Sequence, residues 1–258
     1  MMKLTVLGSG TAVPHPRRAS TSHWLETGAG SLLLDASAAI VHRMAQENLD
    51  WVGLDAIWIS HFHLDHVGGL APLLFGTKHA PQTQSRRKPL TIFGGSGLKN
   101  LFQAFDEAND YKLLQQPFAV EIREVEPGAE FEILPCLTAK TFSTPHTEES
   151  LAIRLTDERG TSLVFTSDTG YTEELGPFAA DVDLFLMECS FPKNKPTEKH
   201  LELKDAMQLA QMSQARKVML SHLYPEWDGI DLREEAHKLW PGETIAAEDG
   251  LHLQIEEA

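Results

Sequence analysis

Four residues with metal-binding side chains lie within six positions of one another: His61, His63, Asp65 and His66. They follow directly on the apolar run Ala56–Ile59. Such a run predicts a buried strand, and the Gly68-Gly69 pair after the motif indicates a tight turn into a helix. Imidazole and carboxylate groups suit zinc and its neighbours in the first transition row. Because alternation within a turn lets neighbouring side chains face different ions, the stretch predicts the centre of a two-metal site.

The alternative for a histidine near a strand end is a hydrogen-bonded polar residue without a metal. Four such side chains at the end of one strand would compete for few partners if no cation were present. Leaving buried polar groups unpaired is costly. The grouping therefore favours metal binding.

The motif His61-x-His63-x-Asp65-His66 resembles the signature of the metallo-β-lactamase superfamily of binuclear hydrolases. Three later residues continue the family's order of ligands, each after a strand-like segment: His146, Asp168 and His222. The resemblance runs along nearly the whole chain. It implies an α/β fold, a four-layer αββα sandwich of two packed mixed sheets with helices outside and the ligands on loops at one edge.

The resemblance also implies which residue serves which ion. One metal would be held by His61, His63 and His146, the second by Asp65, His66 and His222, with Asp168 as the bridge. Zinc is expected at both positions, although nitrogen and oxygen ligands also accept manganese or iron. Two such ions can share a hydroxide that attacks the substrate, so no serine or cysteine nucleophile is needed. The alternative role for Asp168 is to cap a following helix.

Asp35 and His200 are further candidates from the same resemblance. In the family an aspartate at the place of Asp35 supports the site from outside the ligand set, and helix capping is the alternative. The runs Glu188–Phe191 and Lys199–Leu201 resemble the branch that includes ribonuclease Z and small cyclic-phosphate phosphodiesterases. There a histidine in the position of His200 binds the phosphate or protonates the leaving oxygen, which a pKa near ~6.5 allows. An exposed loop histidine is the alternative.

The predicted catalytic side chains are therefore Asp65 and His200. Among the other histidines, His15 and His23 are the first candidates for lining a substrate pocket, and Tyr224 is a candidate for substrate contact. The leading hypothesis is a binuclear metal-dependent phosphodiesterase that cleaves a small or cyclic phosphodiester with a metal-bridging hydroxide.

Two other hydrolase functions compete with this hypothesis. A tRNA 3′-processing endonuclease would use His200 equally well. Ribonuclease Z, however, carries a long tRNA-gripping arm before its bridging-aspartate strand, and here only six residues join Leu155 to Ser162. A lactonase or thioesterase of the same superfamily has no evident use for His200. A purely structural metal site is least favoured, because structural zinc sites are closed and a bridged pair leaves coordination positions open.

Composition limits the partners. The 258 residues, 42% hydrophobic and 23% charged, are typical of a globular protein, and we expect one domain. No apolar run approaches the roughly 20 residues of a membrane span, and the glycine-broken start is no secretory segment, which predicts a cytoplasmic protein without membrane contact. A net charge of −15 disfavours nucleic acid without excluding it and favours a small phosphodiester substrate. The oligomeric state is open, a homodimer included.

Apolar periodicity and turn residues predict the elements that position these residues. Strands are expected at 3–7, 22–26, 31–35, 56–59, 90–93, 118–125, 131–134, 137–143, 151–155, 162–166, 183–187, 218–220, near 245 and at 251–255. Helices are expected at 38–47, 67–75, 98–105, 203–214 and 232–239. The second half repeats the outline of the first, which predicts internal pseudo-symmetry. The only two cysteines, Cys136 and Cys189, are expected to be small core residues rather than a disulfide or a zinc knuckle.

Overall fold

Two seven-stranded sheets form the centre of the molecule in the computed structural model, which describes residues 2–256. The first sheet has the spatial order β14 (His252–Ile255), β1 (Met2–Gly8), β2 (Ser22–Thr27), β3 (Gly30–Leu34), β4 (Ala56–Ile59), β5 (Leu90–Gly94) and β6 (Val120–Glu124). The second has the order β13 (Glu243–Ala246), β12 (Lys217–Ser221), β11 (Leu184–Glu188), β10 (Ser162–Phe165), β9 (Leu151–Asp157), β8 (Leu137–Ser143) and β7 (Glu130–Leu134).

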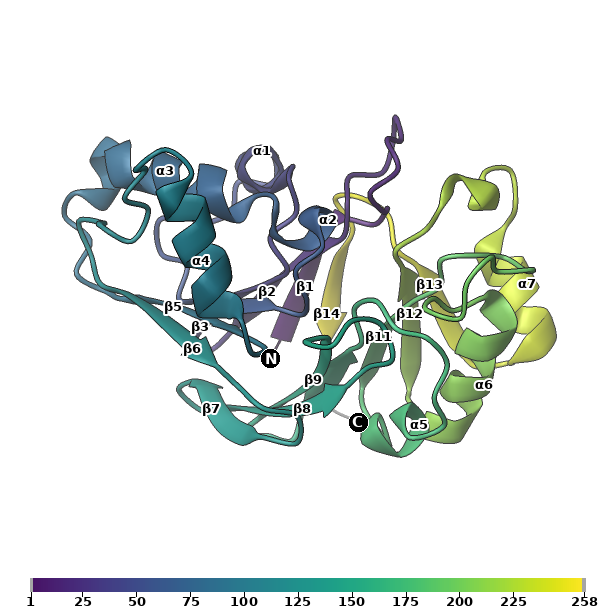
Figure 1. Cartoon of the computed structure of the whole chain (residues 1–258). Coiled ribbons are helices and arrows are strands. Elements are labelled where there is room, and N and C mark those ends of the chain that lie inside the picture. Colours follow the sequence, from purple (N-terminus) through teal and green to yellow (C-terminus); the bar gives the residue numbers. More distant parts are fainter. Residues whose placement is uncertain (1, 257–258) are drawn as a thin grey trace.

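Helices cover the outer face of each sheet. They are α1 (Ile40–Gln46), α2 (Leu64–Val67), α3 (Leu70–His79), α4 (Leu98–Glu107), α5 (Leu175–Phe178), α6 (Leu203–Ser213) and α7 (Leu232–Leu239), with 3₁₀ turns η1 (Pro81–Thr83) and η2 (Pro225–Trp227). The helices α1, α3 and α4 lie over the first sheet, and α5, α6 and α7 lie over the second (Figure 1). The predicted αββα sandwich of two mixed sheets is therefore confirmed.

The central strands bury both faces, which explains why their sequences are apolar without interruption. In β4, Ala56 and Trp58 enter the core between the sheets, whereas Ile57 and Ile59 pack under the helices of the first sheet. This alternation follows from the two-residue period of a strand. Strand β4 is thus packed on both faces, which fixes the position of His61 and the residues after it.

Both sheets follow one pairing plan. From β14 to β3, and again from β7 to β10, neighbouring strands are antiparallel, and the remaining three pairings of each sheet are parallel. The second half of the chain therefore repeats the outline of the first, as the sequence indicated. The core between the sheets draws on strands of both, while the expectation of a single domain stays a prediction.

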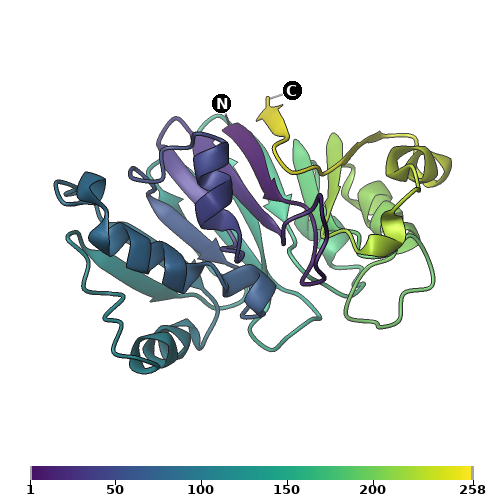
Figure 2. The same cartoon turned by 90° about the horizontal axis from the view of Figure 1, so that it is seen from above.

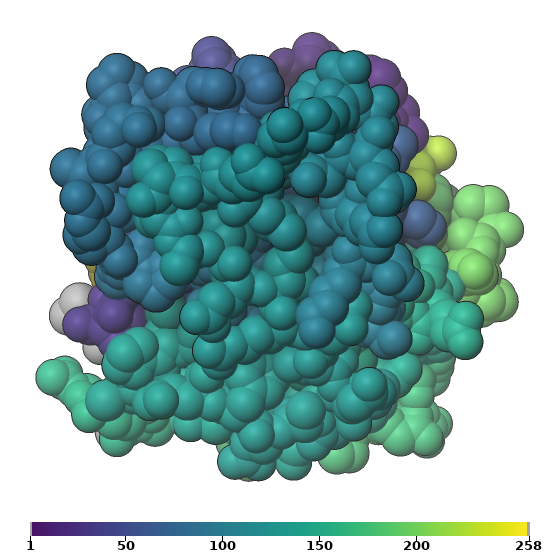
Figure 3. All heavy atoms as spheres, turned by 60° about the vertical axis from the view of Figure 1, so that its left-hand side comes forward, coloured from purple at the N-terminus to yellow at the C-terminus, as the bar shows by residue number. Residues whose placement is uncertain are grey.

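The last strand returns to the beginning of the chain. β14 pairs antiparallel with β1, so that Met2 lies opposite Ile255, and the two ends of the chain are neighbours (Figure 2). On the side of β6 and β7, atoms of the blue and teal segments form a continuous surface (Figure 3). Within residues 2–256, no helix combines the length and apolar character needed to cross a membrane.

Two local predictions were wrong. The helix expected at 67–75 is instead two helices, α2 and α3, separated at Gly68-Gly69. A Cβ atom at Gly69 would lie 2.1 Å from the carbonyl oxygen of Ser37, so the chain passes too close to the start of α1 for any side chain. Cys189 is buried as expected, but Cys136 is exposed, because it lies in the β7–β8 turn with a φ of 60°.

Candidate metal centre

The seven predicted ligands come together at one edge of the two sheets. His61 follows β4, His146 follows β8, Asp168 follows β10 and His222 follows β12, while His63, Asp65 and His66 belong to the turn that starts α2. In β4, β10 and β12 the residues follow the carboxyl ends of strands that run parallel to a neighbour. Strand ends of this kind are common ligand sites in α/β folds.

Three strand ends near the centre adopt left-handed backbone conformations that non-glycine residues rarely take. The φ angles are 58° at Asp35, 52° at Ser167 and 57° at His222. Each such residue costs about 1–3 kcal/mol, and residues of this kind cluster at functional sites. Here the sharp turn after β3, β10 and β12 holds the side chains at the edge where the strands meet.

The first cluster consists of three imidazoles and one carboxylate oxygen. His63 Nδ1 lies 3.1 Å from His61 Nε2 and 3.1 Å from His146 Nε2. Asp168 Oδ2 lies 3.8 Å from His61 Nε2 and 3.7 Å from His146 Nε2. Four ligands about 2.1 Å from one tetrahedral ion would be about 3.4 Å apart, so these four atoms could surround a cation.

The second cluster uses the other oxygen of the same carboxylate. Asp168 Oδ1 lies 3.3 Å from His66 Nε2 and 3.3 Å from His222 Nε2. Asp65 Oδ2 lies 3.6 Å from each of the same two nitrogens. Asp168 therefore faces both clusters, one with each carboxylate oxygen. It does not cap a helix, because the next helix, α5, begins only at Leu175.

Three buried polar atoms of the second cluster are left without a hydrogen bond to the residues described. His66 Nε2, His222 Nε2 and Asp168 Oδ1 are buried and lack a hydrogen-bond partner among the residues described. Buried polar atoms are seldom left unpaired, and nitrogen and carboxylate donors suit a divalent first-row metal. The residues present therefore fit a metal-binding group.

Burial and neighbouring charges shift the pKa values of several groups in the site. Burial favours the neutral imidazole of His66, yet the carboxylates of Asp168 and Asp35 overcome this and raise its pKa well above the usual value. Burial likewise opposes the charged form of Asp168, but the positive charges of His222 and His66 hold its pKa well below the usual value. For His61, burial and the charge of His66 lower the pKa well below 6.5. The site thus combines a permanent carboxylate with a neutral imidazole.

Four of the five histidine ligands are oriented by a hydrogen bond from Nδ1, which leaves Nε2 facing the centre. The acceptors are Asp35 Oδ2 for His66 at 2.7 Å, Ser60 Oγ for His61 at 3.1 Å, Ser190 Oγ for His222 at 3.0 Å and the Lys199 carbonyl for His146 at 2.9 Å. Such partners set the tautomer of a ligating histidine. Asp35 supports His66 and does not cap α1, whose start has no side-chain cap.

His200 faces the centre, so the exposed-loop alternative for this residue is wrong. Its side chain is 12% exposed, and its ring lies 5.0 Å from that of His146 and stacks on that of His222. His200 Nδ1 donates to Glu188 Oε1 at 2.9 Å. Burial opposes the charge on His200, but the hydrogen bond and charge of Glu188 outweigh it and raise the pKa.

Glu188 is held by several further donors. It accepts from the Thr169 and Leu201 amides and from Ser190 Oγ. This one carboxylate therefore links His200 to the support of His222. The sequence indicated that Glu188 lies at a strand end but suggested no role for it. The contacts of Ser60, Ser167 and Ser190 with the predicted site were not expected. Their one signal is a polar residue one or two positions after a buried strand.

The centre opens on one side. His63 is exposed and Asp65 is half-buried, while the other ligands are buried. The Tyr224 ring stacks on Phe191 at 4.7 Å and lies edge-on to His200 and His222 at 6.0 and 5.9 Å. Burial and the nearby carboxylates of Asp168 and Asp65 raise the pKa of Tyr224. Tyr224 is thus near the open centre.

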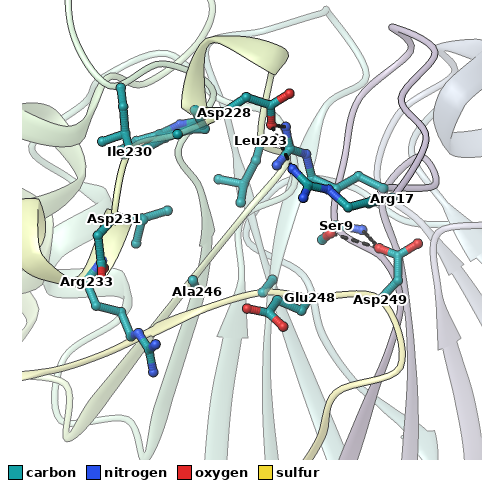
Figure 4. A pocket seen from close by; sticks show the side chains of 15 residues that line it. Ser9, Arg17, Leu223, Asp228, Ile230, Asp231, Arg233, Ala246, Glu248 and Asp249 are labelled. Carbon is teal, nitrogen blue, oxygen red and sulfur yellow. Dashed lines mark hydrogen bonds and ion pairs between the residues drawn. The ribbon is translucent and has the colours of Figure 1, made fainter.

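The two histidines expected to line a pocket lie elsewhere. His23 is fully buried and packs edge-on against Phe165, so it cannot touch a substrate, and that prediction was wrong. His15 contacts Asp228 at 3.0 Å, and Arg18 contacts the same carboxylate at 2.7 Å. These contacts border a hollow of about 570 Å³ that Leu223 also lines (Figure 4). There Asp249 holds Ser9, whose carbonyl accepts from the Leu223 amide.

A family model for the Anti-Pycsar protein Apyc1 matches residues 2–240. The chain belongs to this Apyc1 family. It is 28% identical over 254 residues to the Bacillus subtilis (strain 168) protein described as probable metallo-hydrolase YhfI, which covers 97% of this chain and 98% of the relative. The crystal structure of YhfI, a metallo-β-lactamase fold protein, matches with a TM-score of 0.85 and 26% identity over 98% of each chain.

Ribonuclease Z of Treponema denticola is 25% identical over 306 residues, covering 97% of each chain. A crystal structure of a diphosphatase from the PhnP family has a TM-score of 0.75 at 20% identity, over 99% of this chain and 98% of that one, and supports the fold alone. The Apyc1-family chain is thus a metal-dependent hydrolase with the metallo-β-lactamase fold, similar to YhfI and to ribonuclease Z.

Proposed function

We propose that the protein is a binuclear metal-dependent phosphodiesterase acting on a small or cyclic phosphodiester. The observation that carries the proposal is the position of Asp168, whose two carboxylate oxygens face two separate groups of predicted ligands. In this proposal His61, His63 and His146 hold one ion, Asp65, His66 and His222 the other, and Asp168 joins them. Zinc is the expected metal, and the proposal places the protein in the cytoplasm.

Two divalent ions bound in these positions would supply Lewis-acid activation of water and would neutralise charge on the phosphoryl group. The residues of the chain do the rest. Asp35, Ser60, Ser190 and the Lys199 carbonyl keep each Nε2 directed at the centre. His200, beside the centre and supported by Glu188, protonates the leaving oxygen or holds the phosphate.

Three observations favour a small substrate over precursor tRNA. β9 ends at Asp157 and β10 begins at Ser162, so the connection has no room for a gripping arm. An alignment over 306 residues with a chain of 258 also requires segments that only the Treponema denticola ribonuclease Z has. The net charge of −15 further weakens contact with a polyanion. The tRNA endonuclease remains the second candidate because His200 would serve it equally.

Metal content tests the binuclear site directly. Purified protein loaded with zinc and freed of excess should contain close to two ions per chain by mass spectrometry. A His61→Ala, His66→Ala double change should remove both ions, since each of these residues belongs to a different cluster. One ion or none in the unchanged protein would refute the binuclear assignment.

A substrate screen tests the reaction. The loaded protein should hydrolyse bis-p-nitrophenyl phosphate and cyclic nucleotides, and it should leave a precursor tRNA and a lactone intact. His200→Ala should lower phosphodiester turnover by about 100- to 10,000-fold, the range for a general acid, while both metals stay bound. Hydrolysis of the lactone alone would overturn the proposed function, and loss of metal in the variant would make His200 a ligand.

A further inference from the structure

The side chain of Tyr224 is fixed in place, although its hydroxyl group has no task in the protein. Its amide donates to the Ser190 carbonyl at 3.3 Å, and its own carbonyl accepts from the Trp227 amide at 3.1 Å and from Arg18 Nη2 at 3.4 Å. The ring stacks on Phe191, which is itself buried. Backbone and ring are therefore positioned independently of the hydroxyl.

The loop that carries Tyr224 is tied down on its other side. Asp228 accepts from Arg18 and from His15, and Figure 4 shows this carboxylate turned toward the arginine side chains across the hollow. Trp227 Nε1 donates to the Cys189 carbonyl at 2.8 Å. A side chain locked by such contacts loses little entropy when it binds a ligand.

The hydroxyl of Tyr224 is free to act. Across residues 2–256 it has no hydrogen-bond partner, and it is not one of the enclosed polar atoms. Its ring lies next to both His200 and His222, one a candidate catalytic residue and the other a candidate ligand. A free donor held beside a reaction centre is arranged to meet a substrate rather than to stabilise the fold.

The carboxylates of the centre are paired with imidazoles. In the part of the chain that the structure describes, the ion pairs of Asp65, Asp168 and Glu188 involve histidines only. No arginine or lysine among these residues forms an ion pair with the three carboxylates. His200 and Tyr224 are two donors that lie beside the centre.

We propose that the Tyr224 hydroxyl donates a hydrogen bond to a non-bridging oxygen of the phosphodiester and so helps to select phosphoryl substrates. The inference rests on the proposed phosphodiesterase function. A phenol with an ordinary pKa near ~10 is neutral at pH 7 and keeps its proton. Negative charge on the non-bridging oxygens makes this hydrogen bond charge-assisted, and it strengthens wherever charge gathers on them during the reaction.

The test compares Tyr224→Phe with Tyr171→Phe. Both changes remove one hydroxyl and keep the ring, but Tyr171 points its hydroxyl toward Met212 at the outer surface of α6. We expect Tyr224→Phe to lower kcat/KM for a cyclic nucleotide by about 10- to 150-fold, the range for a hydrogen bond to a charged group. Tyr171→Phe should change it less than twofold. Metal content and melting temperature should be unchanged in both.

Sulfur substitution identifies the contact. In a phosphorothioate substrate, sulfur replaces one non-bridging oxygen in each diastereomer and accepts hydrogen bonds poorly. The loss caused by Tyr224→Phe should shrink for one diastereomer and persist for the other. The affinity of the metal-loaded protein for inorganic phosphate, measured by calorimetry, should also fall in this variant.

Equal losses for the oxygen substrate and both diastereomers would overturn the proposed contact while leaving the phosphodiesterase function intact. If the unchanged protein hydrolysed no phosphodiester, both proposals would fail. A drop in metal content or melting temperature in Tyr224→Phe alone would assign the hydroxyl a structural role and also contradict the inference.

Discussion

Asp35 offers a way to disable one of the two proposed ion sites without touching a ligand. Its Oδ2 atom accepts from His66 Nδ1 at 2.7 Å, from Ser60 Oγ at 2.8 Å and from Ser167 Oγ at 3.0 Å, while Oδ1 accepts from the Ser60 amide at 2.8 Å. In Asp35→Asn, an amide group keeps only one acceptor oxygen. If that oxygen stays with the Ser60 amide, the NH₂ group faces the Nδ1 proton of His66.

Two donors cannot share one hydrogen bond, so His66 should move its proton to Nε2, the atom that faces Asp168 and Asp65. A hydrogen bond to a charged group is worth about 1.5–3 kcal/mol. This corresponds to a loss of about 10- to 150-fold in affinity for the ion at Asp65, His66 and His222, in line with other supports of ligating histidines. The ion at His61, His63 and His146 should keep its affinity, because Asp35 contacts none of these three.

The assay is a zinc titration of metal-free protein against a chelating indicator, with two binding steps resolved. We expect one step to weaken by about 10- to 150-fold in Asp35→Asn and the other to stay within twofold. Asp55→Asn is the matched control, since Asp55 also accepts from a backbone amide, that of Ser31, but pairs with Lys88 far from the centre. Equal weakening of both steps, or none, would refute the assignment of His66 to a separate ion.

Two further predictions concern stability. Burial, with the charge of His66, lowers the pKa of His23 from 6.5 to about 3. Below pH 6.5 this histidine is therefore protonated in the unfolded chain but stays neutral in the folded protein. Stability is then lost as the pH falls, by about 2 kcal/mol between pH 6.5 and pH 5. His23→Leu should remove this pH dependence, about 2 kcal/mol, from the free energy of unfolding measured with urea. An equal pH dependence in both proteins would contradict the prediction. Gly69→Ala places a methyl group 2.1 Å from the Ser37 carbonyl and should lower the melting temperature by several degrees, whereas Gly76→Ala, where a Cβ meets nothing within 4 Å, should not.

The sequence was most informative where one strand or helix decides its own limits. Strand β8 and helix α7 have the expected bounds, since apolar alternation and the Asp231 cap are local signals. The single helix expected at 67–75 is interrupted because the chain at Gly69 lies against a distant carbonyl, that of Ser37. Nothing within the window of a single helix reveals such a contact.

The candidate site divides in the same way. The grouping of its seven predicted ligands was foreseeable, because the resemblance to the metallo-β-lactamase superfamily implied it. Their supports were not, since Ser60, Ser167 and Ser190 are ordinary polar residues until the folded chain sets them beside an imidazole. The burial of His23 was equally hidden, because its neighbour Phe165 lies in the other half of the sequence.

The shared pairing plan of the two sheets bears on how such a centre can be built. Asp35 and Ser167 follow β3 and β10, which hold the same place in their respective sheets, and the two side chains meet in a hydrogen bond. The reactive groups therefore lie along a seam between two copies of one architectural unit. Neither copy contains all of the predicted ligands, so the proposed reaction requires both halves of the chain.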